Sequence, residues 1–403
     1  VKKRIEQIRQ GIVPEGYVKD KDGIYPRDWA SKKIGQWLKL AERSIVLQDE
    51  EEYQLVTIRR GFGGVDSRGS FLGKNVLVKN YFIVKTGDFI ISKRQIAHGA
   101  CGIVPPELDG AVVSNEYNVF LPQDGTNIQM FNLMMQLPHY KRLFYLMSDG
   151  VHIEKLLFKT QDWMKRTLAM PLLKEQKKIA EILSTQDRAI ELQGRKIEEL
   201  KRFKQGCLER MFPRKGQKVP EKRFPGFTDD WEQRKLGDIG KARSGVGFPD
   251  AEQGGVTGIP FFKVSDMNLG GNENEMTVAN NYVTAEQIAV HRWSPITELP
   301  AIFFAKVGAA VMLNRKRLCR FPFLLDNNTM AYSLSSTKWD ADFAKALFGT
   351  VDLTSLVQAG ALPSYNAGDV ESMEIYLPSL LEQEQIGGFF KQLDNLITLH
   401  QRK

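Results

Sequence analysis

The segment MPLLKEQKKIAEILSTQDRAIEL spans residues 170–192 and is echoed near the C-terminus by LPSLLEQEQIGGFFKQLDNLITL at residues 377–399. Identical positions of this pair recur at a constant offset of 207 residues, among them Pro171/Pro378, Glu175/Glu382, Gln176/Gln383, Ile179/Ile386 and Asp187/Asp394. A second pair, DWASKKIG at residues 28–35 and DWEQRKLG at residues 230–237, recurs at an offset of 202. Self-similarity at long, fixed offsets indicates two structural repeats in this chain of 403 residues.

The repeat is cyclic. The first copy continues as IEELKRFKQGCL at residues 197–208, and its counterpart is KKRIEQIRQGIV at residues 2–13, at the other end of the chain. On these alignments Lys403 corresponds to position 196 and Lys2 to position 197. We therefore expect the N-terminal segment to complete the C-terminal helix.

Apolar residues in both long segments follow the alternating steps of four and three that are typical of a coiled-coil seam. The pattern predicts two long helices that pair antiparallel, although ordinary helix packing is an alternative explanation. Gln186, Gln193 and His400 occupy seam positions, where polar side chains can fix the register. The predicted pairing residues are Ile179, Leu183, Ile190, Ile197 and Leu200 in the first helix and Ile386, Phe390, Leu393 and Ile397 in the second.

Two blocks of similar length contain short apolar runs bounded by Gly, Pro, Asn and Asp, which predict strands. Occasional helical stretches make each block α+β. The predicted fold class is thus α+β: two similar globular domains separated by a pair of long antiparallel coiled-coil helices, in a pseudo-twofold cyclic repeat. The predicted boundaries are residues 1–15 for the segment completing the second helix, 16–168 for the first domain, 169–213 for the central helix, 214–223 for a linker, 224–376 for the second domain and 377–403 for the C-terminal helix.

The charge is concentrated in one segment. The chain carries 56 Lys and Arg against 48 Asp and Glu, a formal net charge of +8. Residues 165–222 hold sixteen basic and eight acidic residues, which accounts for the whole excess. This surplus favours a polyanionic partner such as DNA near the central helix.

Several classes of protein are excluded by composition. Three widely spaced cysteines supply neither a disulfide framework nor a zinc cluster, and the five histidines lack metal-ligand spacing, so we expect no metal site. No apolar stretch is long enough to span a bilayer, and no basic-then-apolar leader opens the chain. We expect a soluble cytoplasmic protein without membrane association.

Motifs for enzyme chemistry are missing. GSFLGKN at residues 69–75 lacks the glycine spacing and the Ser or Thr of a phosphate-binding loop. The acidic residues near 250 are not followed by the acidic-x-Lys element of a metal-dependent nuclease. VPPE at residues 104–107 is not the Asn-Pro-Pro or Asp-Pro-Pro loop that holds a flipped adenine in a methyltransferase. By elimination we expect a binding protein with no catalytic residue and no cofactor of its own.

A pseudo-twofold protein suits a pseudo-twofold DNA target, because two similar domains on a rigid spacer select two half-sites at a fixed separation. About forty helical residues in the central segment span on the order of 60 Å at 1.5 Å each. Since the two blocks differ in sequence, the half-sites should differ as well. The sequence therefore favours a bipartite, asymmetric target in double-stranded DNA.

The doubled DWxxxxxG motif, the two Pro-led helices that open with Glu-Gln, and the strand motifs KTGDFIISK and IPFFKVSD resemble the specificity subunit of type I restriction-modification systems. The similarity covers essentially the whole chain. It implies that each block is a target recognition domain and that the subunit itself is not catalytic. It also implies partners: two adenine-N6 methyltransferase subunits that use S-adenosylmethionine, and restriction subunits that use ATP and Mg²⁺ to translocate and cut DNA, in a bacterial or archaeal cytoplasm.

Base-contacting residues do not follow from this resemblance, because recognition domains vary. On physical grounds we expect them among Arg and Lys in turn-rich stretches with polar neighbours, since Arg can address guanine, Asn adenine, and Lys mostly phosphate. The candidates are Arg59, Arg60, Arg68, Lys93 and Arg94 in the first block, and Lys263, Lys306, Arg315, Lys316, Arg317, Tyr365 and Asn366 in the second.

Two other functions are open at this stage. One is the detached recognition half of a combined restriction-methylation enzyme, and the other is a coiled-coil adaptor that binds only protein.

Overall fold

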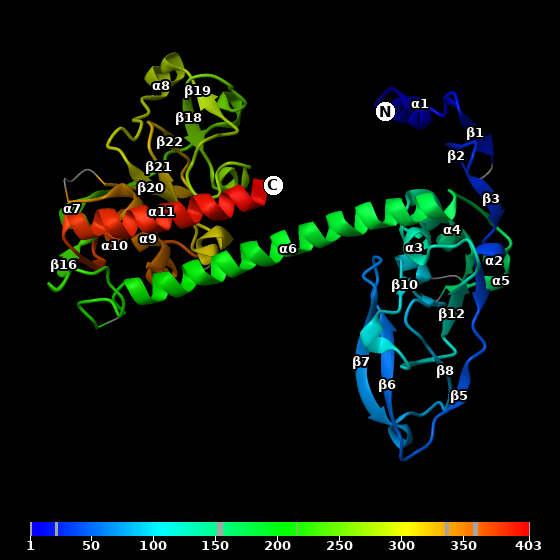
Figure 1. Ribbon diagram of the computed structural model, residues 1–403. Coiled ribbons are helices and arrows are strands. Elements are labelled where there is room, and N and C mark those ends of the chain that lie inside the picture. Colours follow the sequence, from blue (N-terminus) through cyan, green and yellow to red (C-terminus); the bar gives the residue numbers. More distant parts are fainter. Residues whose placement is uncertain are drawn as a thin grey trace. The chain divides into compact units, whose positions relative to one another are not determined.

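The computed structural model describes residues 2–20, 23–150, 156–214, 216–334, 338–357 and 362–402. Lys403, which the cyclic alignment uses, lies outside these residues. The chain forms two compact units, Val1–Ile190 and Glu191–Lys403, each of which mixes helices and strands (Figure 1). The long helix predicted for the central segment is α6 (Leu173–Met211), and its residues are divided between both units. The α+β class with two repeated domains is confirmed.

Unit 1 contains two main sheets. The first is antiparallel, in the order β10-β9-β12-β4, and the second has the order β5-β8-β11-β6-β7. The strands of the first sheet are β4 (Leu38–Leu40), β9 (Phe89–Ser92), β10 (Cys101–Ile103) and β12 (Tyr117–Pro122). Those of the second are β5 (Ser44–Val46), β6 (Glu52–Ile58), β7 (Val65–Leu72), β8 (Asn80–Ile83) and β11 (Val112–Ser114).

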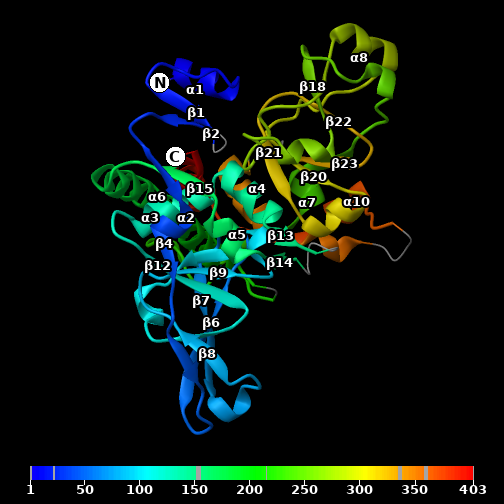
Figure 2. The same ribbon diagram turned by 90° about the vertical axis from the view of Figure 1, so that its right-hand side faces the viewer.

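Helices cover one end of unit 1, grouped around β4 and β12, while β6, β7 and β8 extend away from them (Figure 2). These helices are α2 (Ile34–Trp37), α3 (Ile128–Met135), α4 (Pro138–Leu146) and α5 (Thr160–Met164), whereas α1 (Lys2–Arg9) lies apart from them, next to the N-terminal strand pair. Short 3-10 helices cover Gly73–Asn75, Ile96–His98 and Pro106–Leu108. Small antiparallel pairs are formed by β1 (Tyr17–Asp20) with β2 (Gly23–Pro26) and by β13 (Ser148–Asp149) with β14 (Leu157–Phe158).

Unit 2 repeats this plan with fewer strands. Its first sheet, in the order β17-β23-β20-β21, consists of β17 (Lys241–Ser244), β20 (Ala301–Ala305), β21 (Lys316–Cys319) and β23 (Thr329–Ser333). Its second sheet, in the order β19-β18-β22, consists of β18 (Ile259–Phe262), β19 (Tyr282–Val283) and β22 (Leu324–Leu325). The helices are α7 (Leu236–Ile239), α8 (Ala285–His291), α9 (Ala341–Thr350), α10 (Ala367–Glu371) and α11 (Leu380–Arg402). Short 3-10 helices cover Asp250–Glu252, Val264–Asn268, Ala309–Leu313 and Leu353–Leu356.

The two units share a topology that their block sequences do not reveal. Read from the other edge, the first sheet of unit 2 has the order β21-β20-β23-β17, which matches β10-β9-β12-β4 strand for strand, with every neighbour antiparallel. In the second sheets, β11 runs parallel to β6 as β22 runs parallel to β18. The repeat therefore extends through the blocks, and β5 and β8 are additions in unit 1.

The equivalent strands β9 and β20 explain the apolar runs seen in the sequence. Both are buried on both faces, and their side chains alternate between two separate cores. In β9, Phe89 and Ile91 enter one core and Ile90 the other. In β20, Ile302 and Phe304 enter one core and Phe303 the other.

In each block, a strand near the start pairs antiparallel with a strand at the end. The DW motifs supply β3 (Ala30–Lys33) and β16 (Glu232–Lys235), which pair with β15 (Thr167–Met170) and β24 (Glu374–Leu377). The glycine that ends the second motif, Gly237, lies so close to Glu371 that a Cβ atom there would stand 3.1 Å from the Glu371 Cβ. In each repeat, the strand formed by the DW motif is therefore hydrogen-bonded to the strand that leads into the Pro-led long helix.

The glutamine of the second Glu-Gln pair anchors α11 to its block. Gln383 is 2% exposed. Its amide nitrogen donates to Pro378 O (3.1 Å) and Lys338 O (3.0 Å), and its carbonyl oxygen accepts from Asp340 N (3.0 Å). Asp340 in turn caps the N-terminus of α9 through Phe343 N. One buried side chain therefore joins the start of α11 to the start of α9.

The same arrangement occurs in unit 1. Gln176 is fully buried, donates to Pro171 O (2.8 Å) and Gly125 O (2.9 Å), and accepts from Asn127 N (2.8 Å). Asn127 caps α3 as Asp340 caps α9. We call this contact the glutamine latch. The sequence showed its glutamines as a recurring pair but gave no sign of their partners, which are main-chain groups.

We predict that Gln383→Leu lowers the free energy of unfolding by about 2–4 kcal/mol, because it leaves buried main-chain donors and acceptors without partners. Gln385→Leu is the matched control, since Gln385 lies two residues on in the same helix and is exposed. Urea denaturation of the full chain measures the difference, and hydrogen exchange at the start of α9 should accelerate only in the Gln383 variant. Equal effects of the two substitutions would contradict the latch.

Candidate functional site

Within unit 2, the second half of α6 pairs antiparallel with α11. The two helices lie side by side in Figure 1. The Gln193 amide nitrogen donates to His400 O (2.8 Å) and lies 3.1 Å from His400 Nδ1. Farther along, the rings of Phe212 and Phe390 lie 5.9 Å apart. The two polar seam residues thus contact each other at a defined register.

The Gln193–His400 contact joins equivalent positions of the two repeats. The two residues are 207 positions apart, which is the offset of the repeat, so each is the equivalent of the other. A contact between equivalent residues of two antiparallel helices is what a local twofold axis through the helix pair would produce.

A buried carboxylate reinforces the helix pair. Asp394 on α11 is 6% exposed and accepts from Lys204 of α6 (2.5 Å) and from Lys345 of α9 (2.7 Å). Three helices are thereby joined at one acidic group. The sequence pattern does not identify either ion pair, because the partners lie far apart in the chain.

The linker of residues 214–223 packs onto unit 2 in its described part. Arg223 forms two hydrogen bonds (2.8 and 2.7 Å) with Glu382, which is 1% exposed, and Arg210 pairs with Glu221. Pro220 is buried. The equivalent of Glu382 in the first copy, Glu175, is exposed.

The predicted pairing residues fall into two groups. Leu200, Ile386, Phe390, Leu393 and Ile397 are buried, and Ile197 is half-buried. Ile179 packs against the core of unit 1 beside the latch.

Two of these residues are exposed: Leu183 (42%) and Ile190 (70%). The seam is therefore covered in the second half of α6 and open in the first half.

Three candidate base readers of the first block lie on the β6–β7 hairpin. Arg59, Arg60 and Arg68 are all exposed, and Arg59 pairs with Asp66 across the hairpin. The turn between the strands contains Phe62 with φ of 60°. Arg59 and Arg60 lie at the turn, whereas Arg68 lies farther along β7, opposite Leu55 and Val56.

The other two candidates of this block, Lys93 and Arg94, hold a turn in place. The Lys93 ammonium donates to Asn115 O, and Arg94 pairs with Glu116 (2.7 Å). Both contacts tie the end of β9 to the turn between β11 and β12.

The candidates of the second block are more enclosed than expected. Lys263 is half-buried and donates to Gln253 Oε1 (3.0 Å), and Lys306 is also half-buried. Arg315, Lys316 and Arg317 lie at the start of β21 and line a pocket beside α6, α9 and α11.

Tyr365 does not fit its predicted role as a base reader. It is 5% exposed and its hydroxyl donates to Ala305 O (2.6 Å), because an aromatic ring with a polar tip fits a core that offers one acceptor. Burial also raises the pKa of this hydroxyl. Asn366 is exposed, but its side-chain oxygen caps α10 by accepting from Asp369 N (3.1 Å).

Within the described ranges, no group of three or more His, Cys, Asp and Glu side chains could hold a metal ion. Nor does any described helix combine the length and apolar character needed to cross a membrane.

Comparison with known proteins identifies the family. The profile described as type I restriction modification DNA specificity domain matches the chain twice, over residues 26–202 and 228–403. The type I restriction enzyme MjaVIII specificity subunit of Methanocaldococcus jannaschii is 21% identical over 417 residues, covering 94% of this chain and 89% of that protein. The putative MjaX specificity subunit of the same organism is 23% identical over 412 residues, covering 96% and 92%.

Solved structures share the fold. The S subunit of the type I restriction-modification system from M. genitalium matches with a TM-score of 0.56 at 14% identity, covering 93% of this chain and 91% of that one. A chain from work on complex assembly and conformational transition of the type I R-M system matches with a TM-score of 0.52 at 15% identity, covering 94% and 93%. Because the family profile matches both repeats, the chain belongs to the specificity subunits of type I restriction-modification systems, with one DNA specificity domain in each repeat.

Proposed function

We propose that this chain is the sequence-specific DNA-binding subunit of a type I restriction-modification complex and recognises a bipartite, asymmetric site with one domain per half-site. The observation that carries the proposal is that one chain holds two domains of the same topology, and that the repeat equivalents Gln193 and His400 contact each other in the helix pair of unit 2. A twofold arrangement of readers matches two half-sites at a fixed spacing.

Differences between the two domains support an asymmetric target. The second sheet has five strands in unit 1 and three in unit 2. The exposed arginines of the β6–β7 hairpin lie on a strand pair whose equivalent in unit 2 is the much shorter β18–β19 pair. Different surfaces on equivalent scaffolds would read different bases.

We also propose that the subunit holds its partners without catalysing a reaction. A local twofold axis creates two equivalent surfaces, which suits binding of two copies of one methyltransferase subunit. On this proposal S-adenosylmethionine would bind to the methyltransferases, and ATP and Mg²⁺ to the restriction subunits. The complex would act in the cytoplasm, where the DNA is.

The N-terminal segment would complete the second helix, as the cyclic repeat requires. Ile5 of α1 is 45% exposed, and its repeat equivalent is the buried Leu200. The exposed Leu183 and Ile190 of α6 are the equivalents of the buried Phe390 and Ile397. Applying the twofold operation to the observed helix pair would place α1 on the open half of the α6 seam.

This operation predicts one new ion pair. Lys204 and Asp394 correspond to Arg9 and Asp187, so Asp187→Lys should destabilise the chain and Arg9→Glu should restore part of the loss, with a coupling of about 0.5–1 kcal/mol. Thermal unfolding of the four variants measures this coupling. Arg4→Glu is the control partner, because its repeat equivalent, Glu199, is exposed. Equal rescue by Arg4→Glu and Arg9→Glu would rule out the specific pair.

Base-resolution mapping of methyladenine tests the main function. A host carrying this chain and its methyltransferase should show a gapped motif with two unlike halves. Replacing residues 224–376 by the equivalent block of another specificity subunit should change one half only. A continuous motif, or a change in both halves, would contradict one domain per half-site, and loss of all selectivity would favour a protein-only adaptor.

The helix pair should set the gap between the half-sites. One heptad added to both helices keeps the seam in register and lengthens the spacer by about 10 Å, or roughly three base pairs. Methyladenine mapping should show the longer gap with both half-sites unchanged. A heptad in α6 alone is the control and should weaken methylation, because Gln193 and His400 no longer meet. An unchanged gap in the double insertion would show that the helices do not measure the distance.

A further inference from the structure

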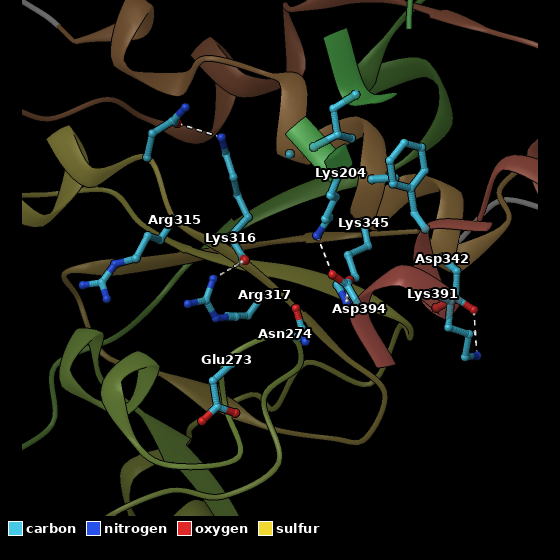
Figure 3. A pocket seen from close by; sticks show the side chains of 15 residues that line it. Lys204, Glu273, Asn274, Arg315, Lys316, Arg317, Asp342, Lys345, Lys391 and Asp394 are labelled. Atoms are coloured by element: carbon cyan, nitrogen blue, oxygen red, sulfur yellow. Dashed lines mark hydrogen bonds and ion pairs between the residues drawn. The ribbon is translucent and has the colours of Figure 1, made fainter. Parts of the chain in front are cut away.

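A strongly basic pocket lies inside unit 2, between β21 and the helices α6, α9 and α11 (Figure 3). Its volume is about 290 Å³, and Asn274 adds an amide to its lining. The basic side chains that line it are Lys204, Arg315, Lys316, Arg317, Lys345 and Lys391.

Two of the three acidic residues of the pocket are each shared by two cations. Asp394 accepts from both Lys204 and Lys345 (Figure 3). Asp342 accepts from Lys391 (2.9 Å) and from Arg320 (2.5 Å). Arg320 also pairs with Glu275 (3.1 Å), so the charges around Asp342 balance. Asp394 balances only one of its two lysines and leaves one positive charge in excess.

Arg317 is held by neutral acceptors. Its guanidinium donates to Asn272 O (2.6 Å) and Lys316 O (2.9 Å), both main-chain carbonyls. Burial lowers its pKa, although the charges of Glu273 and Asp394 act in the opposite direction.

Lys316 is also held by neutral acceptors. Its ammonium donates to Asn314 Oδ1 (2.7 Å) and to Val351 O, and burial lowers its pKa to about 8. In the part of the chain that the structure describes, neither Lys316 nor Arg317 has a carboxylate within 4.0 Å. Burying a cation without a counter-ion is unfavourable, so an anion that entered the pocket would be stabilised by both.

The rim of the pocket offers a further unused donor. The Arg315 guanidinium donates to Asn268 Oδ1 (2.7 Å), whereas its Nε is buried and has no hydrogen-bond partner among the described residues. A single anion with several acceptor oxygens could serve more than one of these cations, and phosphate has more such oxygens than a carboxylate.

We propose that this pocket is a binding site for a phosphate group, supplied either by the DNA backbone or by a free phosphate compound. The proposal rests on the charge and contacts of the pocket and does not depend on the function proposed above. Ions or backbone phosphates bound here would also bridge α6, α9 and α11 to β21, and so would stabilise the base of the second recognition domain.

Calorimetric titration of the full chain with inorganic phosphate and with pyrophosphate tests the site, at constant ionic strength kept by sodium chloride. We expect saturable binding that Lys345→Gln weakens by about tenfold or more, because Asp394 keeps Lys204 while the pocket loses one charge. Lys391→Gln is a second, more exposed variant with the same expected direction, in case the first one unfolds. Lys201→Gln is the control, since Lys201 is exposed and pairs with Glu198 on α6.

A duplex without the recognition site distinguishes the two sources of phosphate. If the group comes from DNA, inorganic phosphate should compete with the duplex and Lys345→Gln should weaken duplex binding. If it comes from a free compound, the variant should lose phosphate binding and keep duplex binding. Phosphate binding no stronger than that of chloride, or the same in all three variants, would overturn the site and leave the methylation pattern unaffected.

Discussion

The rest of the structure depends on one buried amide in each repeat. Gln176 and Gln383 each form three hydrogen bonds, and every partner is a main-chain group. A buried amide that is fully bonded in this way fixes the start of the long helix against the start of a helix in the block. Because the partners are main-chain atoms, the glutamine latch does not restrict which side chains the block carries. The recognition surface can therefore differ in sequence while the latch stays the same.

The second constraint is the contact between two equivalent residues. Gln193 and His400 are repeat equivalents that contact each other in the helix pair, and the glutamine latch fixes each block relative to its own helix. The features that the two repeats share therefore lie mainly in the helices and latches, whereas most differences lie in the blocks. This division matches the sequence, in which similarity is high at the edges of the repeats and low between them.

The sequence predicted those features that recur at a fixed spacing. The two repeats, the central helix and the polar seam residues follow from periodicity, and α6 (Leu173–Met211) lies inside the expected bounds of 169–213. Contacts between residues far apart in the chain left no such signal, as Asp394 with Lys345 and Arg223 with Glu382 show. Individual base readers were the least predictable, because residue type alone cannot separate a surface residue from a core residue. Tyr365 was expected to be a polar reader, but its side chain is buried and its hydroxyl donates to Ala305 O inside the core.

The fold does not explain the positive charge at the start of the central helix α6. Lys174, Lys177 and Lys178 lie in the first two turns of α6, where the helix dipole disfavours cations by about 0.3–1 kcal/mol each at exposed sites. Their equivalents in α11 are Leu381, Glu384 and Gln385, although that helix starts with the same proline and the same latch. Since the second copy forms the same joint without these lysines, packing does not require them. The proposed DNA partner would account for these lysines, since each lysine that neutralises a phosphate releases a counter-ion and strengthens binding.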